Sequence, residues 1–159
     1  MMVLVDTPIW SLALRRKSAD LSSSEESLTR ALAELVREGR AQLIGMVRQE
    51  LLSGIREPEK FDRLRDYLRA FDDIHLDRAD YEEAAQFNNR CRNRGIAGSP
   101  IDFLICAVAD RRRWQIFTTD TGFKHYQTVL GLKLYRPYPG ALPPRFSKRG
   151  IPRLSSLGN

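Results

Sequence analysis

The chain has 159 residues, of which 42% are hydrophobic and 29% charged, a composition typical of folded globular proteins and not of disordered or fibrous ones. This length suits one domain with a core of its own, and no apolar run approaches the roughly 20 residues that span a bilayer. The net charge of +6 favours a polyanionic partner without identifying one.

The first predicted element is a strand. Val3–Val5 is a β-branched and aliphatic run, typical of a buried parallel strand, and it ends at Asp6. Pro8 suits the first turn of a helix, and Ile9 and the apolar residues after it recur at helical spacing. We therefore expect a helix to begin at Thr7, directly after the strand.

A polar loop and a second helix are predicted next. Ser23 and Glu26 have the spacing of a capping box, in which each residue satisfies a backbone N–H of the other. Gly39 is placed to end this helix. Residues 41–44 then predict a second strand, and residues 46–55 a third helix.

The alternation of strands and helices continues along the chain. Further helices are predicted from Pro58 onward and over residues 77–94, 101–110 and 123–130, and further strands over residues 74–76, 115–118 and 132–135. Strands that alternate with helices predict an α/β fold, in which helices cover both faces of a central parallel sheet of about five strands.

Regular patterning ends near Tyr135. We therefore predict one domain over residues 1–136, followed by a Pro/Gly-rich tail over residues 137–159. The tail contains several basic residues and no acid, so it is predicted to be an irregular basic segment.

The two cysteines, Cys91 and Cys106, are far apart in the sequence and have neither a CxxC nor a Cys/His spacing. They are predicted to be free thiols, not a disulfide framework or a zinc site. The N-terminal residues lack the basic, apolar and small-residue regions of a signal peptide, so we expect a cytoplasmic protein.

Four acidic residues are placed where predicted elements end or begin. Asp6 ends the first strand, Asp120 follows the fourth, Glu50 lies one turn into the third helix, and Asp102 lies in the first turn of the helix opened by Pro100. The carboxyl ends of parallel strands share one edge of a sheet, where ligands bind. We therefore expect the four carboxylates to converge at this edge.

A cluster of carboxylates is unfavourable by itself, because like charges raise one another's pKa. A hard divalent cation relieves the repulsion, and Mg²⁺ or Mn²⁺ takes oxygen ligands of this kind. Such an ion can polarise a phosphoryl oxygen and generate hydroxide for attack on phosphorus. The pattern favours a metal-dependent enzyme that hydrolyses phosphodiester bonds.

Each acid also has a structural interpretation. Asp102 could complement the positive end of a helix, Asp120 could form a turn, and Glu50 could lie on a solvated helix face. Asp6 is harder to explain in this way, since Asp is a poor strand former. A haloacid-dehalogenase-like phosphatase is disfavoured, because such enzymes carry a second Asp where this chain has Pro8.

Four segments of the chain resemble the signature blocks of PIN domains, and most closely those of the VapC-type toxins of bacterial toxin–antitoxin pairs. The segments are VLVDTPIW at residues 3–10, RQELLSG at 48–54, SPIDFLICA at 99–107 and TTDTGF at 118–123. They occur in the family's order, and the resemblance spans about residues 3–136.

The resemblance implies a three-layer α/β/α PIN-like fold and an endoribonuclease that depends on Mg²⁺ or Mn²⁺. The residues that match the family's metal-binding catalytic acids are Asp6, Glu50, Asp102 and Asp120. The residues that match its supporting hydroxyl groups are Thr7 and Thr118. The resemblance also implies an RNA substrate, a cognate antitoxin and a homodimer, with no membrane association.

One position departs from the family pattern. Many PIN domains have a further acid two residues after the position of Asp120, and this chain has Gly122 there. The resemblance therefore leaves the number of metal ions open.

Basic residues are expected to contact the RNA backbone. Setting the four acids aside raises the net charge of the remaining chain from +6 to +10, which suits a polyanionic substrate. Candidate contacts, each with a solvated surface as the alternative, are Arg15, Arg16, Arg111, Arg112, Arg113, Arg145, Lys148, Arg149 and Arg153.

Two further hypotheses stay open. An apolar helical surface is expected to anchor an antitoxin segment, unless core packing claims its residues, which are Trp10, Leu14, Leu51 and Ile55. A non-catalytic RNA- or partner-binding module on the same scaffold is the competing functional hypothesis.

Overall fold

A computed structural model of the chain describes residues 1–137. The predicted tail, with Arg145, Lys148, Arg149 and Arg153, lies almost entirely outside the described residues. The first elements are β1 (Val3–Val5), α1 (Thr7–Leu14), a short 3-10 helix (Ser18–Asp20), α2 (Ser23–Arg37), β2 (Ala41–Gln42) and α3 (Gly45–Leu52). The later ones are α4 (Pro58–Leu68), α5 (Arg78–Arg92), α6 (Pro100–Arg112), β3 (Gln115–Phe117) and α7 (Gly122–Leu130).

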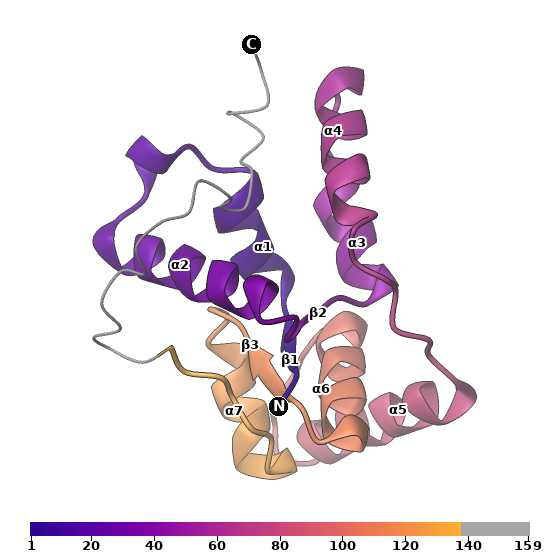
Figure 1. Ribbon diagram of the computed structural model, residues 1–159. Helices are drawn as coiled ribbons and strands as arrows, with labels where there is room; N and C mark the ends of the chain where they lie inside the picture. The colour runs from indigo at the N-terminus through magenta and orange to yellow at the C-terminus, as the bar shows by residue number, and fades with distance from the viewer. Residues whose placement is uncertain (138–159) are drawn as a thin grey trace.

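The sheet is short and parallel, in the order β2-β1-β3. The central strand pairs Val3 with Ala41 on one side and with Gln115 on the other. Every residue of β1 is fully buried, because helices cover both faces of the sheet. Figure 1 shows α1 and α2 on one side and α5, α6 and α7 on the other, which is the predicted three-layer α/β/α arrangement.

The predicted number of strands was wrong, since the described residues form a sheet of three strands and not of about five. Residues 74–76 approach the sheet through one hydrogen bond, from the Ile74 N–H to the Leu43 carbonyl, at 3.4 Å. Residues 132–135 form an isolated bridge between Leu134 and Ile116. Pro137 has no N–H to donate, which limits pairing beyond that bridge.

The start of α2 lies one residue before the predicted one. Ser22 is the N-cap: its hydroxyl accepts from the Glu25 N–H at 3.2 Å, and the Glu25 carboxylate accepts from the Ser22 N–H at 2.9 Å. The run of three serines and two glutamates allows a capping box in two registers, so the spacing of Ser23 and Glu26 could not choose between them.

Two expectations about single residues are confirmed. Cys91 and Cys106 are free and buried. Gly39, with a φ of 67°, stands directly after α2, where the left-handed conformation favours glycine. Among residues 1–137, no helix combines the length and apolar character needed to cross a bilayer.

A buried ion pair joins the start of α5 to the end of α6. The Asp80 side chain is fully buried, and its carboxylate accepts hydrogen bonds from Arg111 at 2.6 Å and from Arg112 at 2.7 Å and 3.1 Å. It also closes a capping box with Asp77. These bonds, led by that from Arg112, hold the pKa of Asp80 well below its usual value of 3.8, so the buried charge is compensated.

We expect Asp80→Asn to lower the free energy of unfolding by about 2–4 kcal/mol at neutral pH, because it leaves Arg112 without an acid and Arg111 with Asp77 alone. The lowered pKa makes the contribution of Asp80 full above about pH 4 and decreasing as the pH falls below that value. Urea denaturation from about pH 7 down to pH 3 measures both effects.

The matched control is Asp62→Asn, which breaks an exposed pair with Arg65 and should cost less than about 1 kcal/mol. Equal losses in the two variants would contradict the structural role assigned to Asp80.

Candidate active site

Asp6 lies at the carboxyl end of β1 and is 6% exposed. Its backbone N–H donates to the Phe117 carbonyl at 2.9 Å, which continues the pairing of β1 with β3. Its carboxylate accepts from the Thr7 N–H at 2.8 Å, as the N-cap of α1, and from the Thr118 hydroxyl at 2.7 Å. One carboxylate is thus held between the first turn of a helix and the end of the neighbouring strand.

The environment of Asp6 favours its protonated form. Burial raises the pKa of Asp6 to about 6, while the hydrogen bonds from Thr118 and Thr7 work in the opposite direction. The charges of Asp102 and Glu50 raise the pKa further. These two carboxylates are therefore close enough to Asp6 to repel it.

Glu50 reaches the same edge of the sheet from α3. Its carboxylate accepts a hydrogen bond from the Thr7 hydroxyl. Thr7 consequently serves two acids, with its backbone N–H on Asp6 and its hydroxyl on Glu50. Because α1 and α3 pack together, this shared residue connects the first strand to the third helix.

Asp102 lies in the first turn of α6, in a capping box with Ser99. The Asp102 carboxylate also accepts from the Tyr126 hydroxyl at 2.8 Å. The Tyr126 ring packs against Phe103 and Phe123, with centroid distances of 5.0 Å and 5.3 Å. Burial, and then the bond to Asp102, raise the pKa of Tyr126, so its hydroxyl remains a donor at neutral pH.

Asp120 is exposed and lies just after β3. Its N–H donates to the Thr118 hydroxyl at 3.0 Å, and its carboxylate accepts from the Gly122 N–H at 2.8 Å. A side chain at Gly122 would begin 3.1 Å from that carboxylate and 3.2 Å from the Tyr126 hydroxyl. The glycine therefore leaves room for both groups.

The structure brings the four predicted acids to one edge of the sheet, and the two predicted hydroxyl residues contact three of them, Asp6, Glu50 and Asp120. Thr7 connects Asp6 with Glu50, and Thr118 connects Asp6 with the backbone of Asp120. In the part of the chain that the structure describes, no three His, Cys, Asp or Glu side chains are already close enough to hold a metal ion. Their present partners are hydroxyl and backbone N–H groups.

Tyr126 is a site residue that the sequence analysis missed. It is 24 residues from Asp102, and its spacing from Phe123 and Leu130 is that of an ordinary buried helix face. No pattern in the sequence connects its hydroxyl with Asp102.

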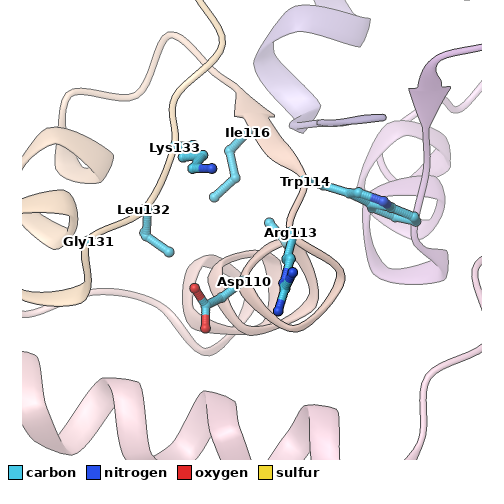
Figure 2. Close-up of a pocket in the computed structure, with 8 residues that line it drawn as sticks. Asp110, Arg113, Trp114, Ile116, Gly131, Leu132 and Lys133 are labelled. Atoms are coloured by element: carbon cyan, nitrogen blue, oxygen red, sulfur yellow. The ribbon is translucent and has the colours of Figure 1, made fainter. Parts of the chain in front are cut away.

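Arg111, Arg112 and Arg113 lie at the opposite edge of the sheet from Asp6, because α6 ends there and leads into the start of β3. Arg111 and Arg112 bind Asp80, a structural role that the sequence analysis did not foresee. Arg113 lines a hollow with Asp110 and Lys133 (Figure 2). The volume of this hollow, about 80 Å³, is far below the roughly 300 Å³ of a small-ligand site.

The prediction that an apolar helical surface anchors an antitoxin was wrong for three of its four residues. Trp10, Leu14 and Leu51 are at most 1% exposed. Trp10 packs edge-on against Phe71, with ring centroids 5.0 Å apart. Core packing claims these residues because α1 is buried between α2 and α3, and only Ile55 is partly exposed.

Comparisons with known proteins identify the family and the fold. A family model described as the PIN domain matches residues 3–129. A search of curated proteins found no match. Among solved structures, the chain resembles FitAcB from Neisseria gonorrhoeae, with a TM-score of 0.67, 20% identity, and coverage of 86% of this chain and 98% of that one.

Two further solved structures have the same fold. VapBC2 from Rickettsia felis, bound to a DNA fragment from its promoter, has a TM-score of 0.62 and 17% identity, and covers 85% of this chain and 98% of its own. A toxin–antitoxin complex from Klebsiella pneumoniae has a TM-score of 0.59 and 19% identity, with coverage of 86% and 98%. At these identities the likeness concerns the fold alone.

We expect Asp6→Asn to stabilise the metal-free protein at neutral and basic pH. Because the folded-state pKa of Asp6 is about 6 against an ordinary 3.8, its ionisation costs stability as the pH rises through 6 and costs nothing below about pH 4. Asparagine keeps an oxygen for the Thr7 N–H and removes the charge. Urea denaturation with chelator present should show a gain of about 2 kcal/mol near pH 8 and little change near pH 4. A loss of stability at both pH values would contradict this explanation.

We expect Gly98→Ala to weaken the site through Tyr126. A Cβ at Gly98 would overlap the Tyr126 hydroxyl and lie 2.8 Å from its ring and 2.9 Å from the ring of Phe103. Displacing Tyr126 removes the donor that orients Asp102. Mn²⁺ affinity, measured by calorimetry, should fall about tenfold or more, and Tyr126→Phe should have a similar effect. The matched control is Gly45→Ala, where an added Cβ meets nothing within 4 Å. Unchanged Mn²⁺ affinity in both Gly98→Ala and Tyr126→Phe would remove Tyr126 from the site.

Proposed function

The chain belongs to the PIN-domain family, and from this premise we propose that it is a Mg²⁺- or Mn²⁺-dependent endoribonuclease and the toxin of a toxin–antitoxin pair. PIN domains are generally nucleases, which gives the reaction class at the level of the family. The RNA substrate, the metal and the assignment of residues are the proposal. We place its action in the cytoplasm, where RNA and a co-produced antitoxin would be present.

The observation that carries the proposal is the buried carboxylate of Asp6, with two further acids near enough to raise its pKa. Burying an acid among acids has an energetic cost that a structural role does not require. A divalent cation would remove the cost, since it stabilises the charged form of each ligand. The cluster has the chemistry of a metal site even when no metal is bound.

The donor set fits a hard divalent cation. We assign Asp6, Glu50, Asp102 and Asp120 as the residues that would hold it, since all four supply carboxylate oxygens and none supplies sulfur or imidazole. A bound Mg²⁺ or Mn²⁺ supplies Lewis-acid stabilisation of the scissile phosphate and a more acidic water. The number of ions is left to experiment, because Gly122 replaces the further acid.

The chain's own residues orient these ligands. Thr7 and Thr118 direct hydrogen bonds at Asp6, which fixes the plane of its carboxylate. Tyr126 does the same for one oxygen of Asp102 and leaves its other oxygen for a ligand. Oriented ligands need less rearrangement when an ion or substrate binds, which is the usual function of such supporting groups.

We propose that the antitoxin occupies an apolar hollow beside the site, in place of the helical surface first considered. The hollow has a volume of about 640 Å³ and is lined by Met46, Tyr81, Ala85, Pro100 and Ile101, among others. The Tyr81 side chain is 56% exposed, which is unusual for a large apolar group. Because the hollow adjoins the start of α6, an arginine from a bound segment could pair with Asp102. A homodimer is proposed from the family resemblance.

The decisive experiment is RNA cleavage by the purified chain. With Mg²⁺ or Mn²⁺ we expect endonucleolytic cuts in single-stranded RNA, which excess chelator abolishes. Asp102→Asn should reduce the rate by more than about 100-fold, since the loss of a metal ligand exceeds the loss of a supporting group. Asp110→Asn, an exposed acid at the other end of α6, is the matched control and should retain activity.

The cleavage assay, combined with co-expression, also tests whether an antitoxin binds and inhibits the chain. Co-expression with the antitoxin, which we expect a neighbouring gene to encode, should give a complex by size-exclusion chromatography that cleaves no RNA until the partner is removed. Cleavage that persists in excess chelator would exclude the metal mechanism. RNA binding without cleavage in any condition would favour the non-catalytic module.

A further inference from the structure

A basic hollow lies beyond the acidic cluster, between the end of α1 and the connection from α3 to α4. It has a volume of about 520 Å³, and its basic residues are Arg15, Lys17, Arg56 and Lys60. We refer to it as the basic pocket. Arg15 is a possible RNA contact by sequence, whereas the fold is needed to bring Lys17, Arg56 and Lys60 into the same pocket.

The pocket has more positive than negative charge. Glu57 is the one acid among the described residues that line it, and it pairs with Lys60 at 2.7 Å. Within residues 1–137, Arg15, Lys17 and Arg56 make no ion pair with an acid, and all three are exposed. Three charged side chains from two separate segments therefore face one hollow without a counter-charge.

The positions of α1 and α3 connect this pocket with the acidic cluster. Thr7, Ser11 and Arg15 follow at intervals of four residues, so they share one face of α1, and all three are at least partly exposed. Glu50 lies on α3, and Gly54, which follows it by four residues and comes just after the end of α3, lines the pocket. The rise of 1.5 Å per residue separates Thr7 from Arg15 by about 12 Å.

The turn after α3 places the basic residues at the end of this path. Gly54 has a φ of 84°, a conformation that other residues rarely adopt, and it lets the chain leave α3 sharply. Arg56 follows two residues later, and α4 begins at Pro58. Arg56 and Lys60 thereby line the same hollow as Arg15.

We infer that the basic pocket binds a backbone phosphate of the RNA substrate, several ångströms beyond the bond that is cleaved. This rests on the proposed function, which places the cleaved bond at the acidic cluster. An extended polyanion with one phosphate at the cluster has its next phosphates at distances comparable to the length of α1. Positive side chains at that distance offset the repulsion that the acids exert on the substrate.

The pocket is suited to phosphate and not to a base. Its charged groups are exposed, and among residues 1–137 no aromatic side chain lines it for stacking. Contacts of this kind fix the position of a strand without selecting its sequence. Binding through the pocket should therefore depend on RNA length and salt and be similar for different sequences.

The test measures binding of homopolymer RNA to the Asp6→Asn protein, in which cleavage should not interfere. Arg56→Glu should lower affinity for RNA of about 20 nucleotides roughly tenfold at low salt, and reduce the slope of log affinity against log salt by about 1. The affinity gained on lengthening the RNA from about 4 to about 20 nucleotides should shrink in the same variant.

The matched control is Arg37→Glu, an equal change of charge on α2 at the other edge of the sheet. Equal effects of the two variants, or no effect of Arg56→Glu, would overturn the inference. Loss of antitoxin binding with RNA binding unchanged would also overturn it and assign the pocket to an acidic segment of that partner. Failure of the wild-type chain to cleave RNA would refute the proposed function separately, because the binding comparison does not depend on cleavage.

Discussion

A carboxylate buried at the end of the central strand determines how the rest of the site is arranged. Asp6 caps α1, accepts a hydrogen bond from the Thr118 hydroxyl and continues the pairing of β1 with β3. Three elements therefore meet at one charged side chain. Thr7, held by this cap, in turn positions Glu50, so the orientation of the first helix is coupled to the acid on the third. The free energy that this arrangement costs comes from burial, and the hydrogen bonds offset part of it.

The charged residues of the molecule fall into two groups, one at the site and one that stabilises the fold. The acids occupy the edge formed by the carboxyl ends of the strands, while Arg111 and Arg112 at the opposite edge neutralise Asp80 inside the fold. The net charge of +6 is therefore not uniformly available to a substrate. Basic residues that lie beyond the acids, at the ends of α1 and α3, are better placed to meet a polyanion than the arginine run that is most conspicuous in the sequence.

The convergence of the acids could be predicted from the sequence because it follows from one rule of parallel sheets. Asp6 and Asp120 follow paired strands, so the rule places them side by side whatever the details of packing. No comparable rule predicts side-chain contacts between helices that are far apart in the sequence. The bond from Tyr126 to Asp102 and the burial of Asp80 depend on how α5, α6 and α7 pack. The predicted strands at residues 74–76 and 132–135 have suitable side chains, but their backbones make too few hydrogen bonds with the sheet.

Asp102 has two structural roles: it closes the capping box of α6, and it is one of the acids of the site. Its carboxylate accepts from the Ser99 N–H, at 3.4 Å, and from Tyr126, so a residue of the first helical turn also faces the site. Transient fraying of the first helical turn would withdraw the carboxylate, and a ligand that holds the carboxylate would suppress fraying. Amide hydrogen exchange at the start of α6 should therefore report site occupancy. A ligand that binds Asp102 only when the first turn is folded makes local unfolding of that turn less frequent, and exchange slows.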